Sequence, residues 1–152
     1  MATLLDEFRS IVSALNDAAI EYAVCGGWAM AIHGLPRATV DIDLLILGED
    51  LERALDVARV KGFEIEGLPL HFEIEIRRIS KIDNKTKQMI TLDFLLVSEN
   101  TIDIWKDRIR VAWDGGVTSV VSRESLIRMK RLAGRTQDLA DIEKLEEVTD
   151  DS

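Results

Sequence analysis

An apolar segment interrupted by acids, residues 40–47 (VDIDLLIL), constrains the fold more than any other part of the sequence. Its leucines, isoleucines and valine predict a buried strand, yet aspartates stand at Asp41 and Asp43. Alternate side chains of a strand point to the same face, so the two carboxylates share a face, about 7 Å apart. Like charges held together repel unless a cation lies between them. The segment therefore predicts either a cation site or a set of local ion pairs.

A second apolar segment, residues 89–97 (MITLDFLLV), carries one acid at Asp93. A buried carboxylate without a partner is unfavourable. If this strand lies beside residues 40–47, the three acids converge, and one or two Mg²⁺ ions would offset their repulsion, as in phosphoryl-transfer sites. The alternative is that Asp41 caps a strand edge, Asp43 pairs with an arginine and Asp93 faces solvent.

Two adjacent glycines, Gly26 and Gly27, follow a short strand predicted at residues 22–25 and precede a short helix predicted at residues 28–32. A strand, a glycine turn and a helix together can bring backbone N–H groups and the positive end of a helix towards a phosphate. Glycine permits this close approach because it has no Cβ. A plain tight turn is the alternative, and the acidic strand that follows favours the phosphate.

The remaining pattern predicts further helices and strands around these segments. Helical spacing of apolar residues and helix-capping residues predict helices at residues 3–18, 51–61, 122–133 and 136–148. Alternating apolar and charged residues predict a strand at 72–79, the sequence Asp-Asn-Lys predicts a turn at 83–85, and the sequence Asp-Gly-Gly predicts a hairpin at 108–121. This order predicts an α/β (α+β) fold, a mixed twisted β-sheet with helices packed on it. We expect a single domain over residues 1–152, with its core at about 20–100 and a C-terminal hairpin and helices at about 101–148.

Composition limits the partners and the location of the protein. The formal net charge of −9 opposes general nucleic-acid binding, because phosphate contacts need a surface rich in lysine and arginine. The charge is compatible with a site that gathers carboxylates around divalent cations. No apolar run reaches the roughly 18–20 residues of a membrane helix, and the N-terminus lacks a signal-peptide pattern. The single cysteine, Cys25, suits a reducing cytoplasm.

The segment CGGWAMAIHGLPRATVDIDLLI resembles the signature of the DNA polymerase β-like nucleotidyltransferase superfamily. That signature is an apolar residue, two small residues, a spacer, and Asp-apolar-Asp in a strand. The superfamily's third carboxylate lies on a later strand, and Asp93 in TLDFLL matches that place. The resemblance covers about residues 22–97. It implies a nucleotidyltransferase-like sheet, dependence on Mg²⁺ with one or two ions, and transfer of a nucleoside monophosphate from a nucleoside triphosphate with release of pyrophosphate.

The C-terminal segment SLIRMKRLAGRTQDLADIEKL is similar to the tails of small bacterial nucleotidyltransferases related to AbiE-type toxins and to lincosamide-resistance enzymes. In those groups a lysine on this helix and an aspartate just beyond it belong to the active-site neighbourhood, which implies roles for Lys130 and Asp138. Lys130 would contact a β- or γ-phosphate, and Asp138 would orient Lys130 or act as a base. The alternatives are a solvated basic face with Arg128 and Arg131, and an Asp138 that favours a helix N-terminus or pairs with Arg135.

The resemblance and the residue chemistry together predict one site. The residues expected to hold metal and, with Lys130, to be catalytic are Asp41, Asp43 and Asp93. The residues expected to bind the nucleotide are Gly26, Gly27, Arg37, Thr39 and Asp138. Arg37 lies on the approach to the acidic strand, where its guanidinium would hold a triphosphate oxygen unless it pairs with a surface acid.

These expectations describe an enzyme, an NTP:acceptor nucleotidyltransferase that uses ATP or another nucleoside triphosphate. The acceptor hydroxyl belongs to an RNA, a small molecule or a protein. Two alternatives stay open: a non-catalytic nucleotide-binding or interaction module on the same scaffold, and an antitoxin-like minimal nucleotidyltransferase that modifies a partner protein in a toxin–antitoxin pair. The apolar C-terminal helices also suggest a homodimer.

Overall fold

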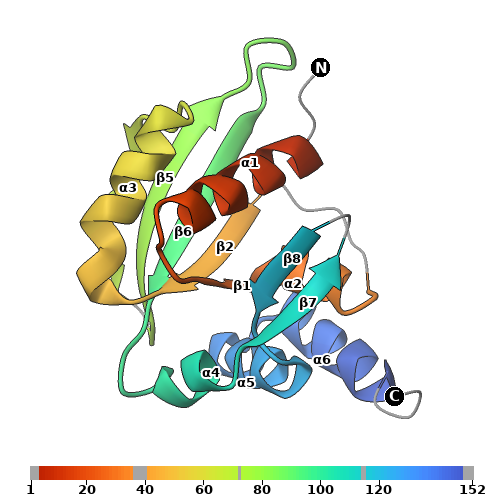
Figure 1. Ribbon diagram of the computed structural model, residues 1–152. Helices are drawn as coiled ribbons and strands as arrows, with labels where there is room; N and C mark the ends of the chain where they lie inside the picture. Colours follow the sequence, from red (N-terminus) through yellow and green to blue (C-terminus); the bar gives the residue numbers. More distant parts are fainter. Residues whose placement is uncertain (1–3, 36–40, 72, 114–115, 149–152) are drawn as a thin grey trace.

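The computed structural model describes residues 4–35, 41–71, 73–113 and 116–148. Its strands are β1 (Ala23–Cys25), β2 (Asp41–Ile46), β3 (Ile65–Glu66), β4 (Leu70–His71), β5 (Glu75–Ile82), β6 (Met89–Leu96), β7 (Ile109–Trp113) and β8 (Gly116–Val120). Its helices are α1 (Leu4–Asp17), α2 (Gly26–Ile32), α3 (Leu51–Val60) after the 3-10 turn η1 (Gly48–Asp50), α4 (Ile102–Lys106), α5 (Arg123–Ala133) and α6 (Thr136–Val148). The predicted fold class, a mixed β-sheet with helices packed on it, is confirmed (Figure 1).

The strands form one sheet in the order β3-β5-β6-β2-β1-β8-β7, with β4 also paired to β5. The central strands β2 and β6 are parallel neighbours, which meets the condition under which the three acids were expected to converge. Strand β5 pairs antiparallel with β6, and β1 pairs antiparallel with β2. Strand β1 also pairs with β8, so it joins the central strands to the C-terminal hairpin β7–β8.

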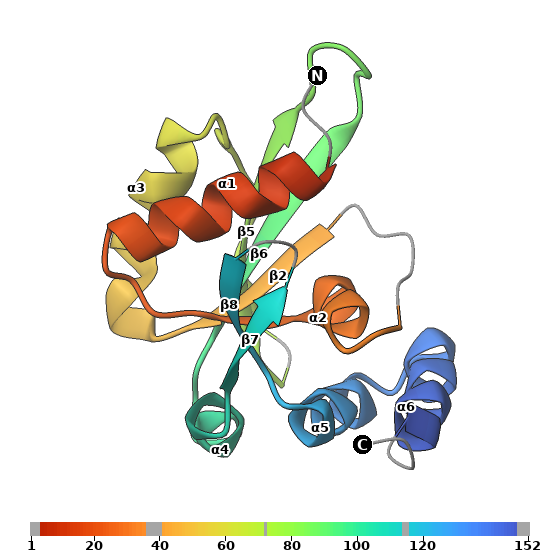
Figure 2. The same cartoon turned by 45° about the vertical axis from the view of Figure 1, so that its right-hand side comes forward.

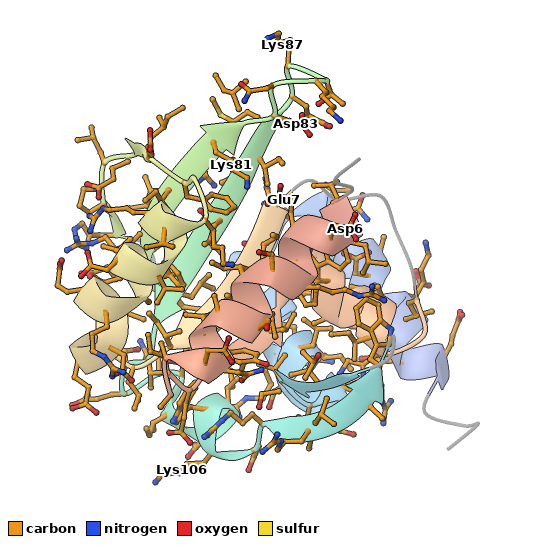
Figure 3. The ribbon with its side chains drawn as sticks, turned by 45° about the horizontal axis from the view of Figure 1, so that its top comes forward. Asp6, Glu7, Lys81, Asp83, Lys87 and Lys106 are labelled. Atoms are coloured by element: carbon orange, nitrogen blue, oxygen red, sulfur yellow. The ribbon has the colours of Figure 1, made fainter. Side chains whose placement is uncertain are left out.

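One face of the sheet is covered by α1 and α3, which contact each other (Figures 1 and 2). Leu92 and Phe94 of β6 are fully buried, and they share this face with Lys81 of β5. Lys81 forms an ion pair with Glu7 of α1, and the two side chains point towards each other in Figure 3. The Lys81 ammonium also lies 4.8 Å from the ring centroid of Phe63. The alternation of β-strand side chains therefore leaves Asp41, Asp43 and Asp93 on the opposite face.

Helices α4, α5 and α6 gather below the sheet in both ribbon views (Figures 1 and 2). A hydrogen bond of 2.9 Å between His33 Nε2 and the carbonyl oxygen of Val121 joins the end of α2 to the segment between β8 and α5. Arg123 of α5 donates to the carbonyl oxygen of Leu145 in α6 at 3.2 Å. In the part of the chain that the structure describes, no helix combines the length and the apolar character needed to cross a bilayer.

The structure corrects the expected strand at residues 72–79, because β5 begins three residues later, at Glu75, and ends at Ile82. The antiparallel register pairs Ile82 with Met89 and carries β5 up to the turn. That turn lies where the sequence predicts it, and Asp83 Oδ1 accepts from the backbone N–H of Lys85 at 2.8 Å. The alternation of apolar and charged residues over 72–79 does not indicate where strand pairing begins or ends. The predicted bounds therefore differ from those of β5. The short elements β3, β4 and α4 were not predicted.

Helix α5 begins and ends at the residues that the sequence predicts. The hydroxyl oxygen of Ser122 accepts from the backbone N–H of Ser125 at 3.1 Å and caps the helix. Gly134 ends it in a left-handed conformation, with φ +66°. Thr136 is not a cap of α6 but its first residue. The carboxylate of Asp138 instead accepts from the backbone N–H of Arg135 at 3.2 Å.

Replacing Ser122 with alanine removes this cap and leaves the N–H of Ser125 without its partner. We expect Ser122→Ala to lower the free energy of unfolding by about 1 kcal/mol. Urea unfolding followed by circular dichroism measures the change. Ser122→Asp is the control, because it keeps a side-chain acceptor at the N-cap and should unfold like the parent. Equal stability of Ser122→Ala and the parent would contradict the capping assignment.

Candidate functional site

The parallel pairing of β2 with β6 sets Asp43 directly opposite Asp93. Asp41 lies two residues earlier on β2, on the same face, opposite Thr91. Asp93 is 5% exposed, and Asp41 and Asp43 are half-buried. The structure therefore brings together the three carboxylates that the sequence selects, and the alternative of a solvent-facing Asp93 is wrong.

Gly26 lies against the carboxylate of Asp43. A Cβ built on Gly26 would stand 2.0 Å from Asp43 Oδ2, which is a severe clash. The residue also has φ +64°, in the left-handed region that glycine tolerates best. The expected tight turn before the helix is corrected here, because α2 begins at Gly26 itself, directly after β1. A glycine is needed at this position to let the start of α2 approach an acid of β2.

The carboxylates interact strongly with each other. Burial and, after it, the nearby charges of Asp93 and Asp41 together raise the pKa of Asp43 to about 7, against the opposing effect of Arg78. Burial and the charge of Asp93 also raise the pKa of Asp41. Cys25, which is opposite Asp43 on β1, has a pKa raised well above its ordinary value, first by burial and then by the Asp43 charge. Binding of a proton or a cation therefore stabilises the cluster.

Arg78 of β5 is the cation that the structure places on this cluster. It lies opposite Asp93 in the β5–β6 register. Its Nε donates to Asp93 Oδ1 at 2.8 Å and its Nη2 donates to Asp93 Oδ2 at 3.0 Å. The hydrogen bond to Asp93 raises the pKa of the guanidinium above its ordinary value. The sequence analysis missed Arg78 as a site residue. The alternation in FEIEIRRI places Arg78 on a strand. Its partner Asp93 can be identified only when the register of β5 against β6 is known.

A second charged cluster lies between α5 and α6. The ammonium of Lys130 is 2.9 Å from Asp141 Oδ2 and 3.8 Å from Asp138 Oδ1, and all three side chains are buried. Arg135 Nε donates to Asp138 Oδ2 at 2.7 Å, so the pairing with Arg135 that was one of the alternatives for Asp138 is present. The Lys130 side chain is 7% exposed, so it does not form a solvated basic face. Its charge acts on Cys25, and the charge of Arg135 interacts with Asp43, so this cluster borders the carboxylates.

The donors fit a divalent cation such as Mg²⁺, whose preferred ligands are carboxylate oxygens. Among the described residues, no three His, Cys, Asp or Glu side chains are grouped so that they alone could hold one ion. This arrangement agrees with the usual binding of Mg²⁺ by one or two carboxylates together with substrate phosphates. The residues that could contribute are Asp41, Asp43 and Asp93. Arg37 and Thr39, which the sequence assigns to the nucleotide, lie outside the described residues.

Trp28 packs inside the molecule, next to the glycines in sequence. Its ring stacks on Phe8 of α1 with 4.5 Å between ring centroids, and Trp113 meets it edge-on at 6.2 Å. The indole N–H of Trp28 is buried and has no hydrogen-bond partner in the described part of the chain. These contacts give Trp28 a core role, in which α1, α2 and β7 are held together.

Comparison with known proteins gives a family and a set of related folds. The family model described as aminoglycoside-2''-adenylyltransferase matches residues 7–107. No curated protein matches the chain. The solved structure of ANT(2'')-Ia with adenylyl-2''-tobramycin is 14% identical, has a TM-score of 0.69, and is matched over 99% of this chain and 91% of that one.

Two further solved structures have the same fold. The lincomycin-bound lincosamide adenylyltransferase LnuA is 15% identical with a TM-score of 0.67, over 93% of this chain and 96% of that one. A candidate nucleotidyltransferase from Thermotoga maritima is 18% identical with a TM-score of 0.66, over 97% and 93% of the two chains. At these identities the structures establish the shared fold.

Gly26→Ala tests the close approach of α2 to the carboxylates. The new methyl group must displace Asp43 or the start of α2, and it sits at an unfavourable φ. We expect a loss of roughly 2–4 kcal/mol in the free energy of unfolding, typical of overpacking combined with backbone strain. Urea denaturation measures it. Gly48→Ala is the matched control, since a Cβ there meets nothing within 4 Å. If both variants unfold alike, the close approach is wrong.

The raised pKa of Asp43 predicts how stability depends on pH without metal. Between pH 4 and 7 the folded protein holds a proton on Asp43 that the unfolded chain has released, because the pKa is about 7 when folded and 3.8 in the reference state. The stability linked to this proton is present below pH 4 and is lost as the pH rises through 7.

Asp43→Asn removes this titration, so we expect the stability difference between variant and parent to grow by roughly 1–3 kcal/mol from pH 4 to pH 8, in favour of the variant. Thermal unfolding in EDTA across this pH range measures the difference. A difference that stays constant with pH would contradict the assignment.

Proposed function

Because the chain belongs to the aminoglycoside-2''-adenylyltransferase family and is a nucleotidyltransferase, we propose that it transfers AMP from ATP to a hydroxyl group of a small cationic acceptor of the aminoglycoside type. The observation that carries the proposal is the cluster of Asp41, Asp43 and Asp93 on one face of β2 and β6. Carboxylates packed this closely favour a cation, and Asp43 stands opposite Asp93 in the register.

The cluster is suited to Mg²⁺ brought with the nucleotide. Asp41, Asp43 and Asp93 would hold the metal, which supplies neutralisation of the triphosphate charge. Binding together with the phosphates accounts for the absence of a complete three-ligand group among the described residues. Asp41 lies two residues along β2 from Asp43, and Asp93 lies opposite Asp43 on β6. Two ions, each held in part by Asp43, would therefore use all three carboxylates.

The chemistry proposed is an in-line displacement. The acceptor hydroxyl oxygen forms a bond to the α-phosphorus, the bond from that phosphorus to the pyrophosphate oxygen breaks, and the hydroxyl proton passes to Asp93. The first backbone N–H groups of α2, at Gly26 and Gly27, are the proposed contacts of the triphosphate. Positioning and charge stabilisation supply most of the rate in phosphoryl transfer, so these groups suffice for the reaction.

We also propose that the α5–α6 cluster serves the triphosphate. Lys130 contacts Asp141 and Asp138, so a direct contact with a β- or γ-phosphate requires its ammonium to exchange a carboxylate for a phosphate oxygen. Arg135 is better placed for a first contact, because its side chain is 77% exposed while Asp138 holds its guanidinium. In this proposal Asp138 orients both cations.

The net charge and the family both support a small cationic acceptor. The chain has 28 acidic and 19 basic residues, which favours a polycationic small molecule over RNA. The structure of ANT(2'')-Ia holds an adenylylated aminoglycoside, and this chain matches 91% of it. We place the reaction in the cytoplasm, where ATP is available and Cys25 stays reduced. The homodimer suggested by the sequence stays a prediction.

Asp93→Asn should abolish adenylyl transfer, because the amide cannot accept the proton and is a weaker metal ligand. We expect kcat to fall by about 10²–10⁴-fold, with the fold retained. The assay follows label from α-labelled ATP, with Mg²⁺, onto a panel of aminoglycosides, lincomycin, tRNA and candidate partner proteins. Asp56→Asn is the control, since Asp56 lies on α3 with a side chain 73% exposed.

Three other outcomes of this assay would each contradict one part of the proposal. Near-parental activity of Asp93→Asn would remove Asp93 from the chemistry. Label on tRNA or on a protein would replace the small-molecule acceptor, as expected of toxin-like or antitoxin-like relatives. No transfer and no Mg²⁺-dependent binding of ATP would leave a non-catalytic module.

A further inference from the structure

Arg78 makes a two-point contact with the acid that the proposed function makes the proton acceptor. Its Nε and Nη2 donate to the two oxygens of Asp93, at 2.8 Å and 3.0 Å. A planar guanidinium bonded through two parallel N–H groups fixes both the position and the rotation of a carboxylate. A lysine ammonium is a single point charge and fixes neither in the same way.

The strand order puts Arg78 and Asp43 on opposite flanks of Asp93. Strand β6 lies between β5 and β2, with Arg78 opposite Asp93 on one side and Asp43 opposite Asp93 on the other. Each carboxylate oxygen can accept more than one hydrogen bond or ligand. The guanidinium therefore holds Asp93 from the β5 side, and the β2 side of Asp93 meets the Asp43 carboxyl, with which it could share a ligand.

The backbone around Arg78 holds the arginine in place. The carbonyl oxygen of Arg78 accepts from the N–H of Gly67 at 3.0 Å. A Cβ on Gly67 would be 3.6 Å from the Cβ of Arg78, so the loop after β3 lies directly over the arginine stem. Two residues along the same face, the hydroxyl groups of Ser80 and Thr91 are 3.2 Å apart. The side chain is 43% exposed, so its outer edge faces water while its fork stays on Asp93.

We propose that Arg78 is a positioning residue, which holds the Asp93 carboxylate in the orientation needed to share a metal-bound nucleotide with Asp43 and to receive the acceptor proton. This inference rests on the proposed function and adds a residue to it. The action is geometric: the fork sets the rotation of Asp93 and stays in place when the nucleotide binds.

Two other roles predict different results. If Arg78 acts only through its charge, Arg78→Lys should behave like the parent, and Arg78→Ala should bind a divalent cation more tightly, because a positive charge has left the site. If Arg78 only supports the fold, its variants should lose activity in proportion to their loss of stability. Geometric positioning instead predicts that lysine fails almost as badly as alanine in a folded protein.

The first measurement is metal binding without turnover. Mn²⁺ is titrated into the full chain in the presence of α,β-methylene-ATP, which cannot be cleaved at the reacting bond, and free Mn²⁺ is followed by electron paramagnetic resonance. We expect Arg78→Ala and Arg78→Lys both to weaken Mn²⁺ binding by about 10-fold. Arg77→Ala is the matched control: Arg77 is the neighbour on β5, its side chain is 36% exposed, and it points to the opposite face. It should bind Mn²⁺ like the parent.

The second measurement is turnover with the acceptor found for the parent. We expect kcat of Arg78→Lys and Arg78→Ala to fall by about 10–100-fold, with a smaller change in KM for ATP, since Asp41 and Asp43 are intact. Added guanidinium ion, far below unfolding concentrations, should restore part of the activity of Arg78→Ala, because the vacated position opens to solvent. Ammonium ion should not. Urea unfolding of each variant establishes that it is folded.

The inference is overturned if Arg78→Lys matches the parent, if Arg78→Ala binds Mn²⁺ as tightly as the parent or more tightly, or if guanidinium and ammonium act alike on Arg78→Ala. These outcomes leave the proposed function intact, since the parent still binds Mn²⁺ and turns over. A parent chain that binds no Mn²⁺ with the nucleotide analogue would instead overturn the proposed function, and this inference with it.

Discussion

The pairing of two acids across parallel strands is the constraint on which the rest of this structure depends. Asp43 and Asp93 face each other because β2 and β6 are neighbours in a fixed register, and a slip of either strand by one residue would turn its carboxylate to the other face. That other face is filled by fully buried residues such as Leu44 and Phe94. The hydrophobic face therefore sets the position of the acids: the free energy of burying leucine and phenylalanine beneath α1 and α3 holds like charges together on the opposite side.

Four features reduce the cost of placing acids on one face of the sheet. Arg78 neutralises Asp93 through a two-point ion pair. The raised pKa of Asp43 lets it keep a proton near neutral pH, which reduces the repulsion. Further along the same face, the hydroxyl groups of Ser80 and Thr91 hydrogen-bond to each other, so this part of the face is polar but uncharged. The cations of the α5–α6 cluster add a longer-range field. The pKa of Asp43 is still raised in their presence, so part of the repulsion among the carboxylates remains.

The sequence predicted the acids and the fold class but not the arginine. Asp41, Asp43 and Asp93 stand out because each interrupts an apolar strand, and the adjacency of those strands was the condition that the structure met. Arg78 could not be assigned in the same way, since its partner depends on where β5 begins, and the predicted strand began three residues too early. Gly26 was predicted to let the backbone approach a phosphate, because it has no Cβ. The atom nearest to it is a carboxylate oxygen of Asp43, and only tertiary packing could reveal that neighbour. The ends of α5 were predictable because Ser122 and Gly134 act locally.

Strand β1 is only three residues long, yet it bonds to β2 on one side and to β8 on the other. Its last residue, Cys25, directly precedes the glycine that meets Asp43, and Val24 bonds to Val121 beyond β8. Strand β1 is thus a narrow seam in the sheet, because it joins the central strands to the C-terminal hairpin. The alignment of both parts depends on the same three residues. Such a seam allows the two sides of the sheet to change separately. A new hairpin or a new pair of C-terminal helices can replace the old one without disturbing the acids, provided that it still bonds to this seam in the same register.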